Sequence, residues 1–372
     1  MQPQPGLRGA ALDRIETPAL IVDLDALERN IARMAAFGRQ SGLRIRPHAK
    51  THRCPPIAVK QVAAGAVGMC AQTVGEAEAL VEAGIADVLM TNQVLAPGKL
   101  ARLARLAERA RVALICDSAE GVTAASRAAS EHGVEVGALV EVDVGMGRCG
   151  VAPGAPARDL AQRIADAPNL AFRGLQAYHG RAQHLRRQAD RQAAIQDAAE
   201  AVRETLGVLD QAGLSAEIVG GAGTGTFRLE AAAGLWTELQ PGSYVFMDRE
   251  YAEIEGASGQ SEPDFEHSLF VLATVISRSE TRAVADAGLK SLSGEKGLPL
   301  LHDLASAEVV GISDEHTVIT LASRDPRLQL GDRLRLIPGH CDPSVNLHDW
   351  IVGVRGDQVE EIWPVAARGA SG

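Results

Sequence analysis

The chain has 372 residues, of which 46% are hydrophobic and 23% charged, a composition that is ordinary for a soluble globular protein. Its length exceeds one average domain and fits a β/α barrel of about 250 residues joined to a smaller domain. A net charge of -10 argues against nucleic acid or an anionic membrane as the main partner, and aromatic residues, at 3%, offer few platforms for stacking bases.

Cysteine usage and hydropathy predict a cytoplasmic protein. The five cysteines form no Cys-x-x-Cys pair, which is typical of a chain kept in a reducing compartment. No run of about 18 apolar residues occurs, and the N-terminus lacks the continuous apolar segment of a secretion signal. We therefore expect neither secretion nor a membrane span.

Short β-rich segments alternate with Ala-rich amphipathic segments over most of the chain. The first, Thr17–Asp23, precedes this alternation, and we expect it to pair with strands near the C-terminus. Helical patterns such as Gly75–Ala83, Gly98–Ala110 and Ala189–Ala212 separate the later strands, and Pro97 suits the first turn of the second helix. The eight later strands are predicted at Leu43–Ala49, Val67–Ala71, Asp87–Thr91, Val112–Cys116, Val136–Val144, Ala171–Tyr178, Ala216–Gly220 and Thr237–Gln240.

Alternation of strands and helices favours a parallel sheet, and eight repeats of the unit favour closure into a barrel over an open doubly wound sheet. After Gly242 the helical pattern ends. Further strands are predicted there at Ser268–Ser277, Arg282–Ala287, Ala307–Ile312, Thr317–Leu321, Arg333–Ile337 and Trp350–Arg355. The predicted fold class is therefore α/β: a (β/α)8 TIM barrel of residues 26–258 and a β domain of residues 1–25 and 259–372.

Reactive side chains follow the ends of the predicted barrel strands, which is where catalytic groups gather in this fold. Lys50 follows the first strand and Gln72 follows the second. Arg148 comes after the fifth strand in a glycine-rich turn, and Tyr178 and His184 lie at and after the end of the sixth. Because the strands are parallel, these side chains are expected to meet at one mouth of the barrel.

A phosphate cradle is predicted from the loops after the last two strands. Gly223, Thr224 and Gly225 follow the seventh strand, and Gly242 and Ser243 follow the eighth. Barrels commonly hold phosphate between these two loops, where glycine allows backbone amides to approach phosphate oxygens. No Gly-Lys-Ser/Thr follows and no dinucleotide-binding unit begins here, so neither a Walker loop nor a Rossmann loop is indicated.

Lys50 lies opposite this cradle, at the mouth of the barrel. An amine in that position can form a Schiff base with an aldehyde cofactor. We expect burial and nearby cations to lower the pKa of the amine, which suits this chemistry. A lone lysine is more often a solvated surface charge, and the position at a strand end is what favours the catalytic interpretation.

His340 and Asp342 are separated by one residue, so an extended chain would present an imidazole and a carboxylate on the same side, with Cys341 pointing away. These ligands suit Mn²⁺, Zn²⁺ or Mg²⁺, and two protein ligands leave positions open for water and substrate. The alternative is that each group is hydrogen-bonded within a loop. Together with Lys50, the pair suggests a Schiff-base enzyme with a divalent metal beside its cofactor.

Four segments together resemble the D-threonine aldolases, which are fold-type III pyridoxal-phosphate enzymes with an alanine-racemase-type barrel and a β domain. The segments are Pro47–Lys50, Glu141–Gly150, Gln176–Gly180 and Pro338–Pro343. The resemblance covers nearly the whole chain, and it implies pyridoxal 5'-phosphate bound to Lys50, a divalent metal such as manganese at His340 and Asp342, and His184 as the base. The cofactor contacts that it implies come from Gln72, Arg148, Tyr178, Thr224, Gly242, Ser243 and Tyr251.

The chain departs from the family pattern at two positions. Ala222 stands where the phosphate loop usually has a third glycine, which is tolerable if Ala222 keeps a negative φ. Thr317 follows His316 where a glycine is common, which puts the local loop geometry in question. Related D-serine dehydratases carry His-x-Cys at the metal, whereas this chain has His-x-Asp, as do the aldolases and the 3-hydroxy-D-aspartate aldolases.

The sequence therefore predicts a metal-assisted, pyridoxal-phosphate-dependent aldolase that cleaves D-β-hydroxy-α-amino acids to glycine and an aldehyde. Its partner would be this small D-amino acid, and we expect a homodimer. One alternative is a dehydratase that forms a 2-oxo acid and ammonia at the same site. Another is a non-catalytic pyridoxal-phosphate carrier, although such proteins are usually single barrels without a β domain. Either His184 or a metal-bound water can be the immediate base.

Overall fold

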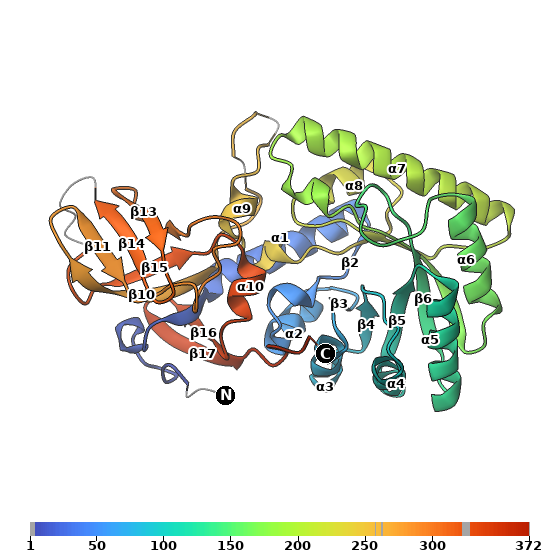
Figure 1. The fold of residues 1–372 in the computed structure, drawn as a ribbon, viewed down its shortest axis with the longest axis horizontal. Helices are drawn as coiled ribbons and strands as arrows, with labels where there is room; N and C mark the ends of the chain where they lie inside the picture. The colour runs from blue at the N-terminus through green and yellow to red at the C-terminus, as the bar shows by residue number, and fades with distance from the viewer. Residues whose placement is uncertain (1–3, 257, 262, 322–327, 372) are drawn as a thin grey trace.

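The computed structural model describes residues 4–256, 258–261, 263–321 and 328–371. A barrel wrapped by helices occupies one end of the molecule, and a β domain occupies the other (Figure 1). The predicted fold class is confirmed, because all eight predicted barrel strands and the six predicted strands of the β domain are present. The residue boundaries predicted for the two parts stay a prediction.

Eight parallel strands form the barrel in the order β2-β9-β8-β7-β6-β5-β4-β3. The two ends of this order meet, since His48 bridges to Cys70 and the amides of Val67 and Cys70 donate to the carbonyls of Ile45 and Pro47. The strands are β2 (Arg44–Ile45), β3 (Met69–Ala71), β4 (Asp87–Met90), β5 (Arg111–Cys116), β6 (Val136–Glu141), β7 (Leu170–Ala177), β8 (Ile218–Gly221) and β9 (Glu238–Leu239).

Helices cover the outside of the barrel, and each buries an apolar stripe against the strands. The first helix begins at a capping side chain, since Asp23 accepts from the amide of Ala26, and ends at Gly42 with φ 69°. The helices are α1 (Leu24–Ser41), α2 (Pro55–Ala63), α3 (Val74–Glu82), α4 (Pro97–Leu106), α5 (Ala119–His132), α6 (Ala155–Asp166), α7 (Gln188–Gln211) and α8 (Phe227–Ala233). As predicted, α4 begins at Pro97.

Short helical segments carry residues at the barrel mouth. They are the 3-10 turns Ala49–Thr51, Arg181–His184 and Ser243–Val245 and the short helices α9 (Arg249–Ala252) and α10 (Cys341–Val345); a further 3-10 turn, Leu12–Arg14, lies near the N-terminus. The first of these turns explains why β2 is shorter than predicted. The chain leaves the strand at Pro47, which has no amide hydrogen to donate, and winds into the turn that contains Lys50.

The β domain is built on a sheet of nine strands within the described residues. As expected, its central strand comes from the N-terminus: β1 pairs antiparallel with β10 and parallel with β16. The strands are β1 (Ala19–Asp23), β10 (Leu269–Arg278), β11 (Arg282–Ala285), β12 (Leu300–Leu301), β13 (Ala307–Ile312), β14 (Thr317–Leu321), β15 (Arg333–Ile337), β16 (Trp350–Arg355) and β17 (Gln358–Pro364).

Two features of this domain bear on the sequence predictions. The strands β12 and β17 were not predicted, because β12 has only two residues and β17 contains the strand-disfavouring pair Glu360 and Glu361. Thr317 begins β14, and its buried hydroxyl donates to the carbonyl of Ala287 at 2.8 Å, so a glycine is not required there.

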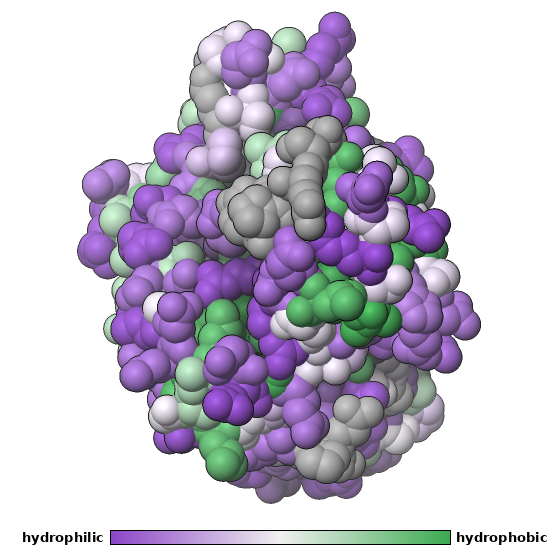
Figure 2. Space-filling view, turned by 90° about the vertical axis from the view of Figure 1, so that its left-hand side faces the viewer, coloured by the Kyte–Doolittle hydropathy of each residue, from purple (hydrophilic) through white to green (hydrophobic). Residues whose placement is uncertain are grey.

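Viewed from the β-domain end, hydrophilic residues surround small hydrophobic groups on the surface (Figure 2).

None of the helices in the described part of the chain combines the length and the apolar character that crossing a membrane requires.

Candidate active site

A cavity lies at the C-terminal ends of the barrel strands, where the barrel meets the β domain. Nearly all of the sequence-predicted site residues line it, and they come from segments far apart in the chain. Those residues are Lys50, Gln72, Arg148, Tyr178, His184, Gly223, Thr224, Gly242, Ser243, Tyr251, His340 and Asp342. The structure therefore brings together twelve of the thirteen predicted residues, and Gly225 is the exception.

A buried histidine fixes the turn that carries Lys50. The amide of Lys50 donates to Nδ1 of His48 at 3.3 Å, and Nε2 of His48 lies 2.9 Å from Oγ1 of Thr91. Since Nδ1 accepts, Nε2 carries the hydrogen and donates to the threonine. Burial and the positive charge of Lys50 hold the pKa of His48 well below its ordinary value, so the ring is neutral.

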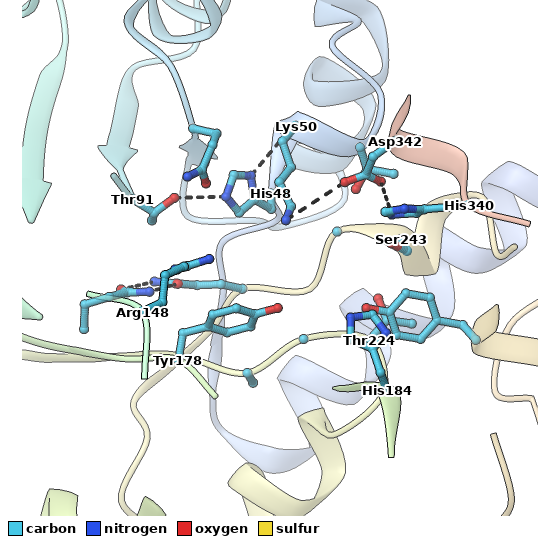
Figure 3. A pocket seen from close by; sticks show the side chains of 18 of the residues that line it. His48, Lys50, Thr91, Arg148, Tyr178, His184, Thr224, Ser243, His340 and Asp342 are labelled. Atoms are coloured by element: carbon cyan, nitrogen blue, oxygen red, sulfur yellow. Dashed lines mark hydrogen bonds and ion pairs between the residues drawn. The ribbon is translucent and has the colours of Figure 1, made fainter. Parts of the chain in front are cut away.

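The amine of Lys50 points toward a carboxylate. Its Nζ lies 4.0 Å from Oδ2 of Asp342 (Figure 3). Burial lowers the pKa of the amine, but the carboxylate of Asp342 and the phenol of Tyr178 raise it by more, so that the pKa lies above its usual value. The expectation of a lowered pKa was therefore wrong. Arg148 does lower it, but the sequence alone did not reveal how near Asp342 lies.

His340 and Asp342 face each other in the cavity wall, with Nε2 of His340 3.7 Å from Oδ1 of Asp342 (Figure 3). The segment is extended only as far as His340, because α10 begins at Cys341. Cys341 is buried and points away, as predicted, with its thiol 3.8 Å from the carbonyl of Met247.

The chemistry of this pair fits a divalent cation. Oδ1 of Asp342 is buried and has no hydrogen-bond partner among the described residues. Nδ1 of His340 lies 3.2 Å from Oε2 of Glu295, so Nδ1 carries the hydrogen and Nε2 keeps its lone pair on the side of Asp342. An unpartnered carboxylate oxygen beside a free imidazole nitrogen is a donor set that a metal ion can satisfy.

The loop after β8 differs from the prediction in two ways. Ala222 has φ 67°, so the condition of a negative φ under which alanine would replace the glycine without strain is not met, and the residue is fully buried. The amide of Gly225 donates to Oε1 of Gln183 at 3.1 Å and faces away from the cavity, so it does not supply the expected phosphate contact. Gly223 is needed for packing, since a Cβ there would lie 2.5 Å from Oε1 of Gln183.

The conformation of Ala222 leads to a stability prediction. A left-handed φ is unfavourable for alanine and free for glycine, so Ala222→Gly is expected to raise the free energy of unfolding by about 1 kcal/mol. Ala231→Gly is the matched control, because Ala231 lies within α8 and glycine there should lower the free energy of unfolding by about 1 kcal/mol. Urea unfolding of the two variants measures both, and a decrease for Ala222→Gly would contradict the prediction.

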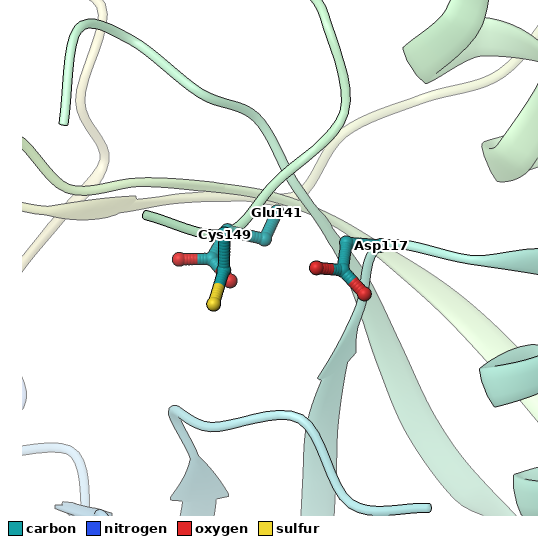
Figure 4. Close-up of side chains that lie close together, drawn as sticks. All are labelled: Asp117, Glu141 and Cys149. Carbon is teal, nitrogen blue, oxygen red and sulfur yellow. The ribbon is translucent and has the colours of Figure 1, made fainter. Parts of the chain in front are cut away.

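Arg148 is held by a cluster of acidic groups and a thiol that the sequence did not single out as a site. Asp117, Glu141 and Cys149 lie close together (Figure 4). Glu141 accepts a hydrogen bond from Gln93, and its other oxygen lies 3.8 Å from Nη2 of Arg148. Burial and the charge of Glu141 raise the pKa of Cys149, which keeps it a thiol. Since Glu141 already has these partners, we assign the cluster to positioning Arg148.

A tight turn presents Arg148 to the cavity, as predicted. Oδ1 of Asp143 accepts from the amides of Gly145 and Gly147, at 3.0 and 2.9 Å. Both glycines have positive φ, 112° and 62°, which the turn requires. The guanidinium of Arg148 thereby enters the side of the cavity where Tyr178 also lies (Figure 3).

Further polar residues line the cavity without having been predicted. His48, Thr51, Thr91, Gln176 and Gln240 all follow or end barrel strands. Gln176 and Gln240 exchange a reciprocal pair of hydrogen bonds between their amides, at 2.7 and 3.1 Å. Oγ1 of Thr51 is buried without a partner among the described residues. The sequence signal that could have identified these residues is their position, since each is a polar residue at or after the end of an apolar strand.

His184 ends a 3-10 turn at the rim of the cavity. Its ring centroid lies 5.8 Å from that of Tyr251, and its Nδ1 lies 2.9 Å from Oε1 of Glu250. Gln183, the preceding residue, ties this turn to the loop after β8 through the amide of Gly225 and the hydroxyl of Thr226. The turn that carries the predicted base therefore rests directly on the predicted phosphate loop.

A match to two family models accounts for most of the chain. Residues 22–250 match the alanine racemase N-terminal domain, and residues 268–354 match a putative serine dehydratase domain. The chain belongs to the alanine racemase N-terminal domain family. In this family member, the first model carries the barrel with Lys50, and the second carries His340 and Asp342.

Individual relatives agree with this family assignment. A 3-hydroxy-D-aspartate aldolase from Paracoccus denitrificans is 44% identical over 98% of this chain and 95% of its own. The D-threonine aldolase from Filomicrobium marinum has a solved structure with a TM-score of 0.94, at 45% identity, covering 98% of this chain and 99% of its own. The predicted resemblance to the D-threonine aldolases is confirmed by these matches.

A third relative is more distant. The D-threo-3-hydroxyaspartate dehydratase from Delftia sp. HT23 superimposes with a TM-score of 0.81 at 28% identity, covering 95% of this chain and 98% of its own. The metal-free form of a D-threo-3-hydroxyaspartate dehydratase variant superimposes similarly, with a TM-score of 0.82 at 27% identity. The alanine racemase-like architecture is therefore shared between relatives named as aldolases and a relative named as a dehydratase.

Proposed function

We propose that this protein is a pyridoxal-phosphate- and metal-dependent aldolase that cleaves D-β-hydroxy-α-amino acids to glycine and an aldehyde. The observation that carries the proposal is the meeting of Lys50 with His340 and Asp342 in one cavity, with Nζ of Lys50 4.0 Å from Asp342. Identities of 44% and 45% to two aldolases over almost the whole chain support the same reaction.

The cavity offers groups for each part of pyridoxal 5'-phosphate. We propose that Lys50 holds it covalently and that Gly223, Thr224, Gly242 and Ser243 bind its phosphate. The hydroxyl of Thr224 accepts from the amide of Tyr244 at 2.9 Å, which leaves its hydrogen free to donate. The ring contacts would come from Gln72, Arg148, Tyr178 and Tyr251. The chemistry that the cofactor supplies when bound is withdrawal of the electron pair left on Cα.

We propose that His340 and Asp342 hold a divalent cation, with Mn²⁺, Mg²⁺ and Zn²⁺ as the candidates. The chemistry supplied by a bound cation is polarisation of the substrate β-hydroxyl. His184 then accepts the hydroxyl proton at Nε2, since Nδ1 faces Glu250. A neutral imidazole suits this step because its unprotonated nitrogen can accept a proton, and histidine is the most common general base in enzymes.

His184→Ala is expected to lower the turnover number by roughly 10²- to 10⁴-fold, which is the usual contribution of a general base. Cofactor and metal content should stay near wild type, because the protein's proposed ligands to both groups are other residues. Steady-state kinetics, visible absorbance and metal analysis of the purified variant check this. A variant with near-normal turnover would eliminate His184 as the base and leave the role to metal-bound water.

The reaction itself is tested by product analysis. The enzyme is incubated with D-threonine, D-phenylserine and 3-hydroxy-D-aspartate, with and without a chelator. We expect glycine and the corresponding aldehyde, and the most active substrate identifies the preferred β-substituent. A 2-oxo acid with ammonia would instead show a dehydratase, and the absence of any product would favour a carrier protein. We further propose a cytoplasmic homodimer, which analytical ultracentrifugation and cell fractionation test.

A further inference from the structure

Glu250 lies beside the proposed base and has no role in the account above. Its Oε1 is 2.9 Å from Nδ1 of His184 and 3.3 Å from Nζ of Lys296. Its second oxygen, Oε2, is buried without a hydrogen-bond partner among the described residues. The Glu250 side chain is 19% exposed, so its carboxylate contacts the imidazole largely out of water.

We propose that Glu250 is a positioning residue for His184: it holds the imidazole with the hydrogen on Nδ1 and directs the lone pair of Nε2 to the substrate. This inference rests on the proposed function, because it assigns a task only if His184 is the base. It goes beyond that function by naming the group that prepares the base.

The tautomer follows from the contact. A carboxylate only accepts, so a neutral imidazole that contacts it through Nδ1 must carry its hydrogen there. Nε2 then has the lone pair that a base requires, and it has no partner among the residues that the structure describes. Burial raises the pKa of Glu250, but the hydrogen bond from His184 and the positive charge of Lys296 lower it, so that the pKa lies below its usual value and the carboxylate is ionised.

The backbone fixes where Glu250 stands. It lies on α9, whose first turn is capped by Oδ1 of Asp248 accepting from the amide of Tyr251 at 3.1 Å. Oδ2 of Asp248 accepts from the amide of Cys341, also at 3.1 Å, and the amide of Glu250 donates to the carbonyl of Gly339 at 3.4 Å. Since α9 is hydrogen-bonded to the segment that carries His340, Glu250 fixes the position of His184 relative to the proposed metal ligands.

A double-mutant cycle tests this role. Glu250→Gln keeps the shape of the side chain and removes its charge, and it is measured alone and together with His184→Ala. We expect the single substitution to lower the turnover number about 10²-fold with KM changed less than about threefold. In the His184→Ala background it should change turnover less than about twofold, because the residue through which Glu250 acts is gone.

Glu253→Gln is the matched control. Glu253 follows α9, and its carboxylate pairs with Arg249 at 2.7 Å and Arg186 at 3.6 Å without lining the cavity. Turnover of this variant should equal that of wild type. Wild-type turnover of Glu250→Gln, or an equal loss in both backgrounds, would overturn the proposal, since a merely structural carboxylate would act independently of His184.

The tautomer of His184 can be measured in the absence of substrate. Nitrogen-15 NMR of the histidine-labelled holoenzyme distinguishes protonated from unprotonated ring nitrogens, and the His184→Ala variant assigns the signals of His184 among the ten histidines. We expect the hydrogen on Nδ1, and a hydrogen on Nε2 would overturn the proposal. This measurement needs no turnover. An enzyme that cleaves none of the tested substrates would therefore count against the proposed function, whereas the tautomer of His184 would still be tested by the NMR spectrum.

Discussion

Replacing Lys50 by alanine is expected to reduce turnover by at least about 10⁴-fold and to abolish the visible absorbance of the bound cofactor. The reason is that Lys50 is the amine proposed to bond the cofactor covalently, and no other lysine lines the described cavity. Loss of a group that forms a covalent bond during catalysis typically costs several orders of magnitude in rate. The turnover number and the absorbance spectrum of the purified variant give the result.

Lys60→Ala is the control for this experiment. Lys60 is a partly exposed lysine on α2 that does not line the cavity; its amine lies 3.4 Å from Glu28, and its loss should leave both readouts unchanged. Reduction of the wild-type enzyme with borohydride followed by peptide mapping supplies independent evidence. Recovery of the reduced cofactor on a lysine other than Lys50 would refute the assignment.

Removing the metal is expected to have the second largest effect. Treatment with a chelator, or Asp342→Ala, should lower the rate of aldol cleavage by about 10³-fold, because a bound metal supplies several kcal/mol of charge stabilisation at the developing alkoxide. The visible spectrum of the cofactor should persist after chelation, since the proposed cofactor ligands are separate from the metal ligands. Activity and metal content are measured before and after adding each divalent cation back.

Asp357→Asn is the matched control for Asp342→Ala. Asp357 is an exposed carboxylate in the turn between β16 and β17, and it does not line the cavity. Its substitution should change neither the activity nor the bound metal. A metal-free preparation that cleaves substrate at the full rate would show that His340 and Asp342 serve another purpose.

The barrel could be predicted because its strands are buried on both faces and therefore stand out as short apolar segments between amphipathic helices. The strand at Asp87–Met90 is an example, since three of its four residues are buried. By contrast, β17 mixes buried and exposed positions and contains two adjacent glutamates, and this obscured it. The hydrophobic pattern of the sequence thus predicted the strands that are buried along most of their length.

The candidate site was predictable where one residue at a strand end marked it, as with Lys50 and Tyr178. Individual contacts between side chains of distant segments were not predictable, because they depend on how those segments pack. The contact of Glu250 with His184 joins α9 to the turn after β7, and the contact of Asp342 with Lys50 joins the two domains. The conformation of Ala222 was left open by the sequence, because alanine itself favours a negative φ whereas the glycine usual at this position in the family allows the left-handed φ that the structure has.

The position of β1 has a consequence for the order in which the protein can fold during synthesis. This strand is synthesised before the barrel strands, yet its two neighbours, β10 and β16, are synthesised after them. The barrel strands are all synthesised before β10, so the barrel can assemble while β1 still lacks both partners. The β domain, and with it the placement of His340 and Asp342, is completed only after the C-terminal strands are released.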